Sequence, residues 1–214
     1  GQLGIGTPFS RETPLAIGAG IKAAAAGGSI DSNSFSLYIT IDGTLWAMGS
    51  NWAGQLGDGT TTQQRIPVQI ANGVTAVAAS RGGAYNLYLK TDGTLWAMGQ
   101  NAYGQFGNGT STTTAVSIPV QIASGVTAIS AGGAHSLYLK TDGTLWAAGV
   151  NSSGQLGDGT TVNRSTAVQV ASGVASIVAG NSHSLFVKTD GTLWATGSNS
   201  SGQLGDGTTV SRST

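Results

Sequence analysis

Three observations predict an all-β fold, a β-propeller built of four-stranded antiparallel blades with four repeats in the chain. First, the pentapeptide Gly-Thr-Leu-Trp-Ala occurs four times, beginning at Gly43, Gly93, Gly143 and Gly191. Second, the 214 residues include 35 glycines, 39% hydrophobic residues and only 8% charged residues, which indicates packed strands and turns rather than disorder. Third, no segment has helical periodicity with caps over three turns. Tandem units of several short strands are typical of propeller blades.

Aligning the repeats by a second marker gives a base period of 48 residues, with extra residues inserted in three places. This marker, Gly-Gln-(Leu/Phe)-Gly, begins at Gly1, Gly54, Gly104, Gly154 and Gly202. We therefore predict a single propeller array over residues 1–214. Its repeats span approximately 1–53, 54–103, 104–153 and 154–201, and residues 202–214 overlap the start of the next repeat.

The third repeat illustrates the four strands expected in each unit, at residues 119–123, 127–131, 135–141 and 144–149. A tight turn at Ser124-Gly125 separates the first two strands. The third strand alternates, with Leu137 and Leu139 on one face, as a strand with one buried face should. Before the fourth strand, Asp142-Gly143 predicts a two-residue hairpin, and Asp-Gly recurs at this place in every repeat.

Charge and composition argue against several classes of function. Lys+Arg and Asp+Glu each number 9, so the net charge is zero and no nucleic-acid partner is expected. No run approaches the roughly 18 apolar residues of a membrane span, so no membrane interaction is expected. The sequence lacks cysteine, a His-x₃-His pair and a calcium-binding loop, so we expect no metal site and no cofactor.

The residues that could act in catalysis follow the repeat, so we expect no enzyme and no catalytic residues. Seven of the eight aspartates lie in the Asp-Gly hairpins or in a Gly-Asp-Gly turn, where a carboxylate usually satisfies turn backbone. His135 and His183 occupy one repeat position, and Phe35 and Tyr85 fill it in the other units. A catalytic base is not expected to be replaced by a packing aromatic residue.

Aromatic residues fall into two groups. Four tryptophans recur once per repeat on the predicted fourth strand, which favours a role in packing between sheets: Trp46, Trp96, Trp146 and Trp194. Trp52 and Tyr103 do not recur, because the corresponding residues of the other repeats are Ala or Ser. A large aromatic residue that its sister loops lack is a candidate for contact with a partner.

The irregular features share one end of the predicted sheets. We call this end, where the second strand connects to the third and the fourth to the next repeat, the variable-loop end, and the opposite end the hairpin end. All insertions fall at the variable-loop end, around Ser29–Asn33, around Ser80–Arg81 and within Ser111–Ile118. Function commonly lies on such loops. The candidate binding residues there are Trp52, Tyr103, Arg81, Asp31, Tyr85, His135 and His183.

The motifs of the third repeat resemble those of a known family. The residues are His135-Ser136-Leu137, Asp142-Gly143, Trp146-Ala147-Ala148-Gly149, Asn151 and Gly154-Gln155-Leu156-Gly157. Together they resemble the regulator of chromosome condensation repeat, and the resemblance covers all four units. It implies a propeller that acts as a protein-binding platform through loops on one face. Eukaryotic members include a guanine-nucleotide exchange factor bound to chromatin, and a bacterial relative inhibits β-lactamases.

We therefore predict a non-enzymatic protein-binding or scaffold module that presents its variable-loop end to a protein partner. One alternative is a lectin-like propeller that binds carbohydrate. Another is a purely architectural segment of a large bacterial surface or secreted protein. The exchange activity of the eukaryotic members is not expected, because the chain is neutral and has no long loop insertion.

The number of blades leaves closure of the ring open. Family members usually close seven blades, and four blades arranged as an open arc would expose both terminal faces. Two chains could form an eight-bladed ring as a homodimer, or the chain could be part of a longer array. We favour these two arrangements over a closed four-bladed monomer.

Overall fold

The computed structural model describes residues 1–6, 12–28 and 33–214, and these residues form four antiparallel sheets. The first sheet contains β1 (Ile21–Gly27), β2 (Phe35–Thr40), β3 (Leu45–Gly49) and β4 (Gln64–Ala71). The second contains β5 (Val74–Ala79), β6 (Tyr85–Lys90), β7 (Leu95–Asn101) and β8 (Thr112–Ala123). The third contains β9 (Val126–Ala131), β10 (His135–Lys140), β11 (Leu145–Gly149) and β12 (Arg164–Ala171). The fourth contains β13 (Val174–Ala179), β14 (His183–Lys188) and β15 (Leu193–Gly197).

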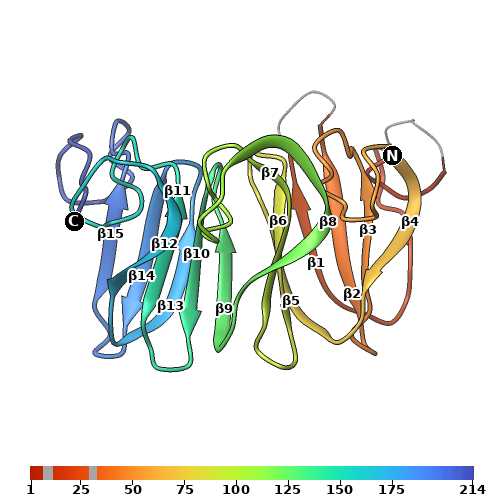
Figure 1. Ribbon diagram of the computed structural model, residues 1–214, viewed down its shortest axis with the longest axis horizontal. Coiled ribbons are helices and arrows are strands. Elements are labelled where there is room, and N and C mark those ends of the chain that lie inside the picture. Colours follow the sequence, from red (N-terminus) through yellow and green to blue (C-terminus); the bar gives the residue numbers. More distant parts are fainter. Residues whose placement is uncertain (7–11, 29–32) are drawn as a thin grey trace.

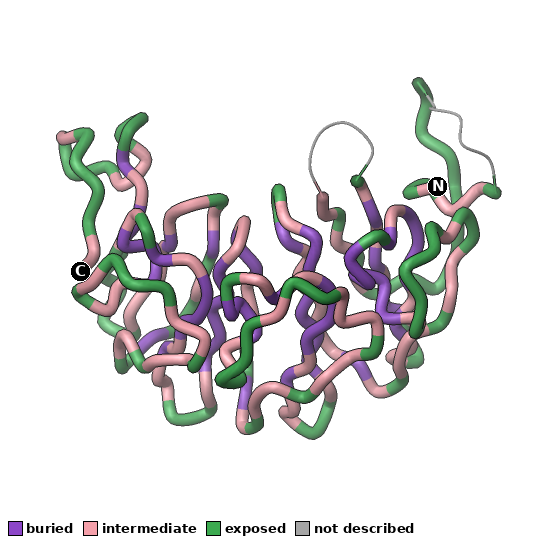
Figure 2. Tube along the Cα trace, turned by 45° about the horizontal axis from the view of Figure 1, so that its top comes forward, coloured by how far each residue is buried: buried purple, intermediate pink, exposed green. Residues whose placement is uncertain are grey.

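The sheets stand side by side in chain order, and the two chain ends lie at opposite ends of the array (Figure 1). Strands within each sheet are paired in sequence order, as in the blades of a propeller. Buried residues run through the middle of the sheets, whereas the Asp-Gly hairpins and the tips of the longer loops are exposed (Figure 2). The prediction of an all-β propeller fold with antiparallel blades is confirmed. Three sheets have the predicted four strands, and the fourth has three strands within the described residues.

The grouping of strands into sheets differs from the sequence prediction. Residues 119–123 belong to β8, which pairs with β7 in the second sheet and not with residues 126–131. The turn at Ser124-Gly125 therefore crosses from the outer strand of one sheet to the inner strand of the next. The prediction that the four strands between residues 119 and 149 form one sheet was wrong, because this turn connects two sheets instead of closing a hairpin.

The Asp-Gly hairpins form as predicted, but with loops of three residues rather than two. Around Asp142, the Lys140 N–H donates to the Thr144 carbonyl at 3.0 Å, and the Gly143 N–H donates to the Lys140 carbonyl at 3.0 Å. Gly143 has a φ of 75°, which a three-residue loop with a bulge requires of its last residue. The Asp142 carboxylate accepts the Thr144 N–H at 3.0 Å, which fixes the turn.

Backbone hydrogen bonds at the hairpin end join each sheet to the next. The Val74 N–H that begins β5 donates to the Gly43 carbonyl in the first hairpin at 2.8 Å. The Thr91 N–H of the second hairpin then donates to the Gly73 carbonyl at 2.8 Å. The same two contacts recur between the later sheets, at Val126 and Thr141 and at Val174 and Thr189. Each of these short turns is thus bonded to the hairpins on both sides of it, which accounts for the constant turn length.

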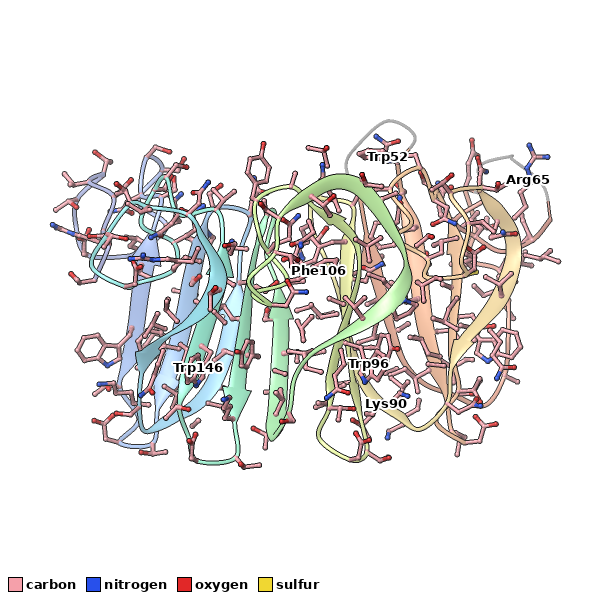
Figure 3. The ribbon with its side chains drawn as sticks, in the orientation of Figure 1. Trp52, Arg65, Lys90, Trp96, Phe106 and Trp146 are labelled. Carbon is pink, nitrogen blue, oxygen red and sulfur yellow. The ribbon has the colours of Figure 1, made fainter. Side chains whose placement is uncertain are left out.

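Apolar side chains of one sheet pack against the next to form three cores. In the first core, Leu37 and Leu45 from the first sheet contact Tyr88, Met98 and Trp96 from the second. The second and third cores repeat this arrangement one sheet further along. The apolar residue of the Gly-Gln-(Leu/Phe)-Gly marker enters these cores as Leu56, Phe106 and Leu156, and Phe106 is visible between the second and third sheets in Figure 3.

The recurring tryptophans take part in this packing, as predicted, at the two inner positions. Trp96 is half-buried against the first core, and Trp146 against the second. The Trp96 ring stacks on Tyr88 with centroids 6.1 Å apart, and the Lys90 Nζ lies 4.8 Å above it. Trp194 is 46% exposed because it lies on β15, the edge strand of the fourth sheet.

The cores predict how truncation affects stability. Leu95 is fully buried between the second and third sheets, so Leu95→Ala should lower the free energy of unfolding by about 2–5 kcal/mol. Ile66 in β4 is 61% exposed, so Ile66→Ala should change it by less than about 0.5 kcal/mol. Urea titrations followed by tryptophan fluorescence measure both values. Equal losses for the two variants would contradict the proposed packing of the sheets.

Candidate functional site

The loops that follow β3, β7, β11 and β15 form much of the variable-loop end, and each is built around a buried asparagine. Asn51 is 1% exposed, and its Nδ2 donates to Asp58 Oδ1 at 2.9 Å and to the Thr60 and Thr62 carbonyls at 3.1 Å each. Its Oδ1 accepts the Leu56 N–H at 2.9 Å. One side chain thereby holds both halves of a loop of about a dozen residues in a fixed arrangement.

The same asparagine recurs in every repeat, although it was not predicted from the sequence as an organising residue. The four positions are Asn51, Asn101, Asn151 and Asn199, and all four side chains are buried. Its strict recurrence beside a glycine-rich marker was the signal that could have identified it. A loop that needs no side chain to bond its backbone tolerates variation at such a position.

The carboxylate of the Gly-Asp-Gly turn belongs to this network. Burial raises the pKa of Asp58, but hydrogen bonds from Thr60, Gln64 and Asn51 more than offset burial and hold the pKa below its usual value. In the third repeat the corresponding Asp158 pairs with Arg164 at 2.7 Å. These aspartates therefore organise the turn, as predicted from the sequence.

Each of the first three of these loops also reaches the next sheet. The Gly59 N–H donates to the Ser117 carbonyl in β8 at 2.9 Å, and the Gln55 carbonyl accepts Asn86 Nδ2 at 2.6 Å. A Cβ on Gly54 would lie 2.6 Å from the Ser117 Cα, so the backbones approach too closely for any other residue. The Gly-Gln-(Leu/Phe)-Gly marker therefore joins neighbouring sheets through hydrogen bonds and close backbone contact.

Trp52 and Tyr103 project from these fixed loops. Trp52 is 52% exposed and lies at the variable-loop end, as Figure 3 shows. Tyr103 is 50% exposed, and its backbone N–H donates to Gln105 Oε1 at 3.0 Å. Both side chains offer large apolar surfaces on a rigid backbone, which lowers the entropy lost on binding.

Arg81, a further predicted residue, lies in the connection between β5 and β6 at this end. Arg81 is exposed, and its backbone forms a bridge with Gly28 of the neighbouring sheet. Asp31 lies outside the described residues. The insertion predicted within Ser111–Ile118 does not enlarge a loop, because it lengthens β8, which has 12 residues where β4 and β12 have 8.

Tyr85 and His135 are not part of an exposed surface, which corrects their selection as contact residues. Both are fully buried between sheets. The Tyr85 hydroxyl donates to the His135 carbonyl, and His135 Nε2 lies 2.9 Å from Ser184 Oγ. The histidine position thus serves packing, as its replacement by Phe35 and Tyr85 in other repeats suggested. His183 is partly buried at the same position of the fourth sheet.

The His135–Ser184 pair lacks the features of a nucleophilic site. Ser184 Oγ donates to the Gln155 carbonyl at 2.7 Å, so its proton is already engaged. Burial lowers the pKa of His135 to about 4, with a further contribution from His183. Across residues 1–6, 12–28 and 33–214, no group of three His, Cys, Asp or Glu side chains could hold a metal ion.

The inner strands line a shallow groove of about 410 Å³ along the axis of the array. Its walls are mostly alanines of β1, β5, β9 and β13, with Arg81 at one end. Small apolar side chains provide little to orient a ligand.

The part of the chain that the structure describes has no helix of the length and hydrophobicity needed to cross a bilayer.

Sequence profiles and solved structures identify similar proteins. Two profiles described as "Regulator of chromosome condensation (RCC1) repeat" match the chain, one over residues 42–89, 92–139 and 142–187, and the other over 74–105, 126–155 and 174–203. Together they cover more than half of the sequence. Among curated proteins, no sequence matches.

Solved structures agree on the fold. Human WBSCR16 superposes with a TM-score of 0.77 at 23% identity, over 90% of this chain and 51% of its own. Prp20p from Saccharomyces cerevisiae gives a TM-score of 0.77 at 22% identity, over 97% of this chain and 52% of its own. The chain thus spans about half the length of these relatives.

The buried histidine predicts a specific pH dependence. The pKa of His135 is about 4 in the folded chain and near 6.5 when unfolded, so the unfolded state binds more protons between these values. Stability is therefore fully present above pH 6.5 and falls as the pH drops towards 4, by on the order of 3 kcal/mol. Urea titrations at pH 7, 5.5 and 4.5 measure this loss.

His135→Tyr installs the residue of the second repeat and should remove most of that loss. His183→Phe retains His135, whose pKa is lowered mainly by burial, and serves as the control, so it should keep most of the loss. Aspartates with lowered pKa lose their contribution progressively below about pH 5 in every variant alike, so the difference between variants reports the histidine. An unchanged profile in His135→Tyr would assign the pH dependence to other groups.

Proposed function

Since this chain belongs to the regulator of chromosome condensation (RCC1) repeat family, we propose that it is a non-enzymatic module that binds a protein partner through its variable-loop end. The observation that carries this proposal is the exposure of Trp52 and Tyr103 on rigid loops. Both are about half exposed, at positions where the other repeats have Ala or Ser. Aromatic residues of this kind are enriched at the energetic centres of protein interfaces.

The physical setting of these residues favours a protein partner over a small ligand. The loops are held by the buried asparagines and by bonds to the next sheet, so the backbone that carries the aromatic residues is fixed. A carbohydrate-binding propeller would be expected to repeat its aromatic residue in every blade, and Trp52 and Tyr103 do not repeat. With no net charge, the chain offers no general attraction for polyanions.

Related structures are consistent with a protein-binding role for this fold. Yeast RCC1 (Prp20) has been crystallised with Kap60 bound, and that structure matches this chain with a TM-score of 0.75 at 22% identity. Such identity speaks for the fold alone, and this chain spans 47% of that one, so the identity of a partner is not transferred.

Capture experiments test the proposal. The immobilised chain should retain a defined set of proteins from a lysate of the source organism, quantified by mass spectrometry. The double variant Trp52→Ser/Tyr103→Ser restores the residue type of the third repeat and should reduce that capture at least tenfold, since a hot-spot aromatic contributes about 2 kcal/mol or more. Its thermal unfolding should change little, because each side chain is about half exposed.

Ile118→Ser is the matched control. Ile118 is 67% exposed on β8, so its replacement removes similar apolar surface outside the loops. This variant should capture the same proteins as the unchanged chain. If the double variant also captures them undiminished, Trp52 and Tyr103 do not contact the partner and the proposal fails.

A further inference from the structure

The dipeptide Asn-Gly occurs twice in the chain, at Asn72-Gly73 and at Asn108-Gly109. Asn72 lies in the short turn between β4 and β5, where the two later repeats have Ser124 and Ser172. Asn108 replaces the aspartate of the Gly-Asp-Gly turn in the loop between β7 and β8. Both asparagines are exposed, so water reaches each of them and access does not distinguish the two sites.

An asparagine followed by glycine is chemically labile, because its side-chain amide can be lost by deamidation. In this reaction the backbone nitrogen of the glycine attacks the asparagine Cγ, and a glycine has no Cβ to hinder the approach. The N–H of the glycine must first lose its proton. A hydrogen bond that this N–H donates stabilises its protonated form and so opposes the reaction. The backbone contacts of the two glycines therefore distinguish the sites.

The peptide between Asn108 and Gly109 is held against β12 of the next sheet. The Gly109 N–H donates to the Ser165 carbonyl at 2.8 Å, and the Ala167 N–H donates to the Gly107 carbonyl at 2.9 Å. Between these two bonds, the backbone of Asn108 forms an isolated bridge with β12. A ring that joins Asn108 Cγ to the Gly109 nitrogen requires the first of these bonds to break.

The peptide between Asn72 and Gly73 has no such contact. Among the described residues, neither the Asn72 carbonyl nor the Gly73 N–H forms a hydrogen bond. The bonds of this turn are made by the next peptide, whose Gly73 carbonyl accepts the Thr91 N–H and whose Val74 N–H donates to the preceding hairpin, both at 2.8 Å. Gln69 Nε2 donates to Asn72 Oδ1 at 2.9 Å, which draws electrons from the Cγ that is attacked.

We propose that Asn72 is a spontaneous deamidation site of the folded protein and that Asn108 is protected from the same reaction. The Gly73 nitrogen gives its proton to hydroxide and bonds to Asn72 Cγ, and the side-chain nitrogen takes up a proton from water and leaves as ammonia. Water then opens the cyclic imide. Cleavage of the bond from Cγ to the nitrogen gives aspartate, and cleavage at the main-chain carbonyl carbon gives isoaspartate. Overall, one water is consumed and one ammonia is released.

The two products differ in their effect on the turn. Aspartate keeps the length of the backbone, so the hydrogen bonds of Gly73 and Val74 are retained. Isoaspartate adds one carbon atom to the backbone directly before Gly73, in a turn that is bonded to the hairpins on both sides. The isoaspartate form should therefore unfold at a lower temperature than the unchanged chain, whereas Asn72→Asp should unfold at nearly the same temperature. The reaction is independent of the binding role proposed for the variable-loop end, because the turn lies at the hairpin end.

Incubation of the full chain at pH 8 tests the proposal, with conversion at each asparagine quantified by peptide mapping and mass spectrometry. In the folded chain, Asn72 should convert at least about fivefold faster than Asn108, the ratio that corresponds to a net hydrogen-bond free energy of about 1 kcal/mol. In urea the two should convert at similar rates, since each is followed by glycine and neither retains its contacts. No conversion of Asn72 in the folded chain, or conversion of Asn108 at an equal or higher rate, would overturn the proposal.

Two variants identify the source of the isoaspartate, which a protein isoaspartyl methyltransferase labels. Asn72→Ser installs the residue of the later repeats and should remove most of the label that the folded chain acquires on incubation. Asn108→Asp is the matched control, because it installs the aspartate of the other repeats, and it should leave the labelling unchanged. If Asn72→Ser is labelled as strongly as the unchanged chain, the isoaspartate arises at another residue and the proposal is wrong.

Discussion

Coverage of each sheet's apolar face by the next sheet is the contact on which the rest of this structure depends. The second sheet shows both halves of the arrangement, since Leu87 and Leu95 face the third sheet while Tyr88 and Trp96 face the first. No helix or second layer contributes to these cores within the described residues. Stability in such an array is approximately the sum of the contributions of the units and of the contacts between neighbouring units. An inner sheet is covered on both faces by its neighbours, whereas a terminal sheet is covered on one. The exposed Leu193 is a direct consequence.

Backbone hydrogen bonding explains why one end of the array is constant and the other varies. At the hairpin end, each connecting turn both donates to the hairpin before it and accepts from the hairpin after it, as Gly73 and Val74 show. An extra residue there would break bonds to two sheets. At the variable-loop end, the asparagine network stabilises each loop largely from within, so side chains such as Trp52 change without disturbing the neighbouring sheet. A rigid scaffold with variable loops is the usual arrangement of binding modules.

The candidate site was predictable only in part. Trp52 and Tyr103 were identified because they depart from the repeat, and departure from a packing pattern correctly indicated exposure. Tyr85 and His135 were selected for their place near the loops, yet each is buried. The alternation of side chains along the strand indicates this burial, because Tyr85 lies on the same strand face as Leu87, which packs into the second core. The asparagine network was missed because its bonds join residues up to 11 positions apart that no local pattern connects.

The sequence by itself determined the strands, the Asp-Gly hairpins, the tandem repeat and the family, because each depends on alternation or turn chemistry within a few residues or on motifs that recur along the chain. Only the tertiary structure decided which strands share a sheet. Residues 119–123 could pair with the following strand or with β7, and their sequence suits both. The choice is made by the short turn at Gly125, whose carbonyl accepts the Thr141 N–H while the Val126 N–H donates to Gly93. Those partners belong to two different sheets, so the turn must pass between them, and no pattern within one repeat encodes where the neighbouring sheet lies.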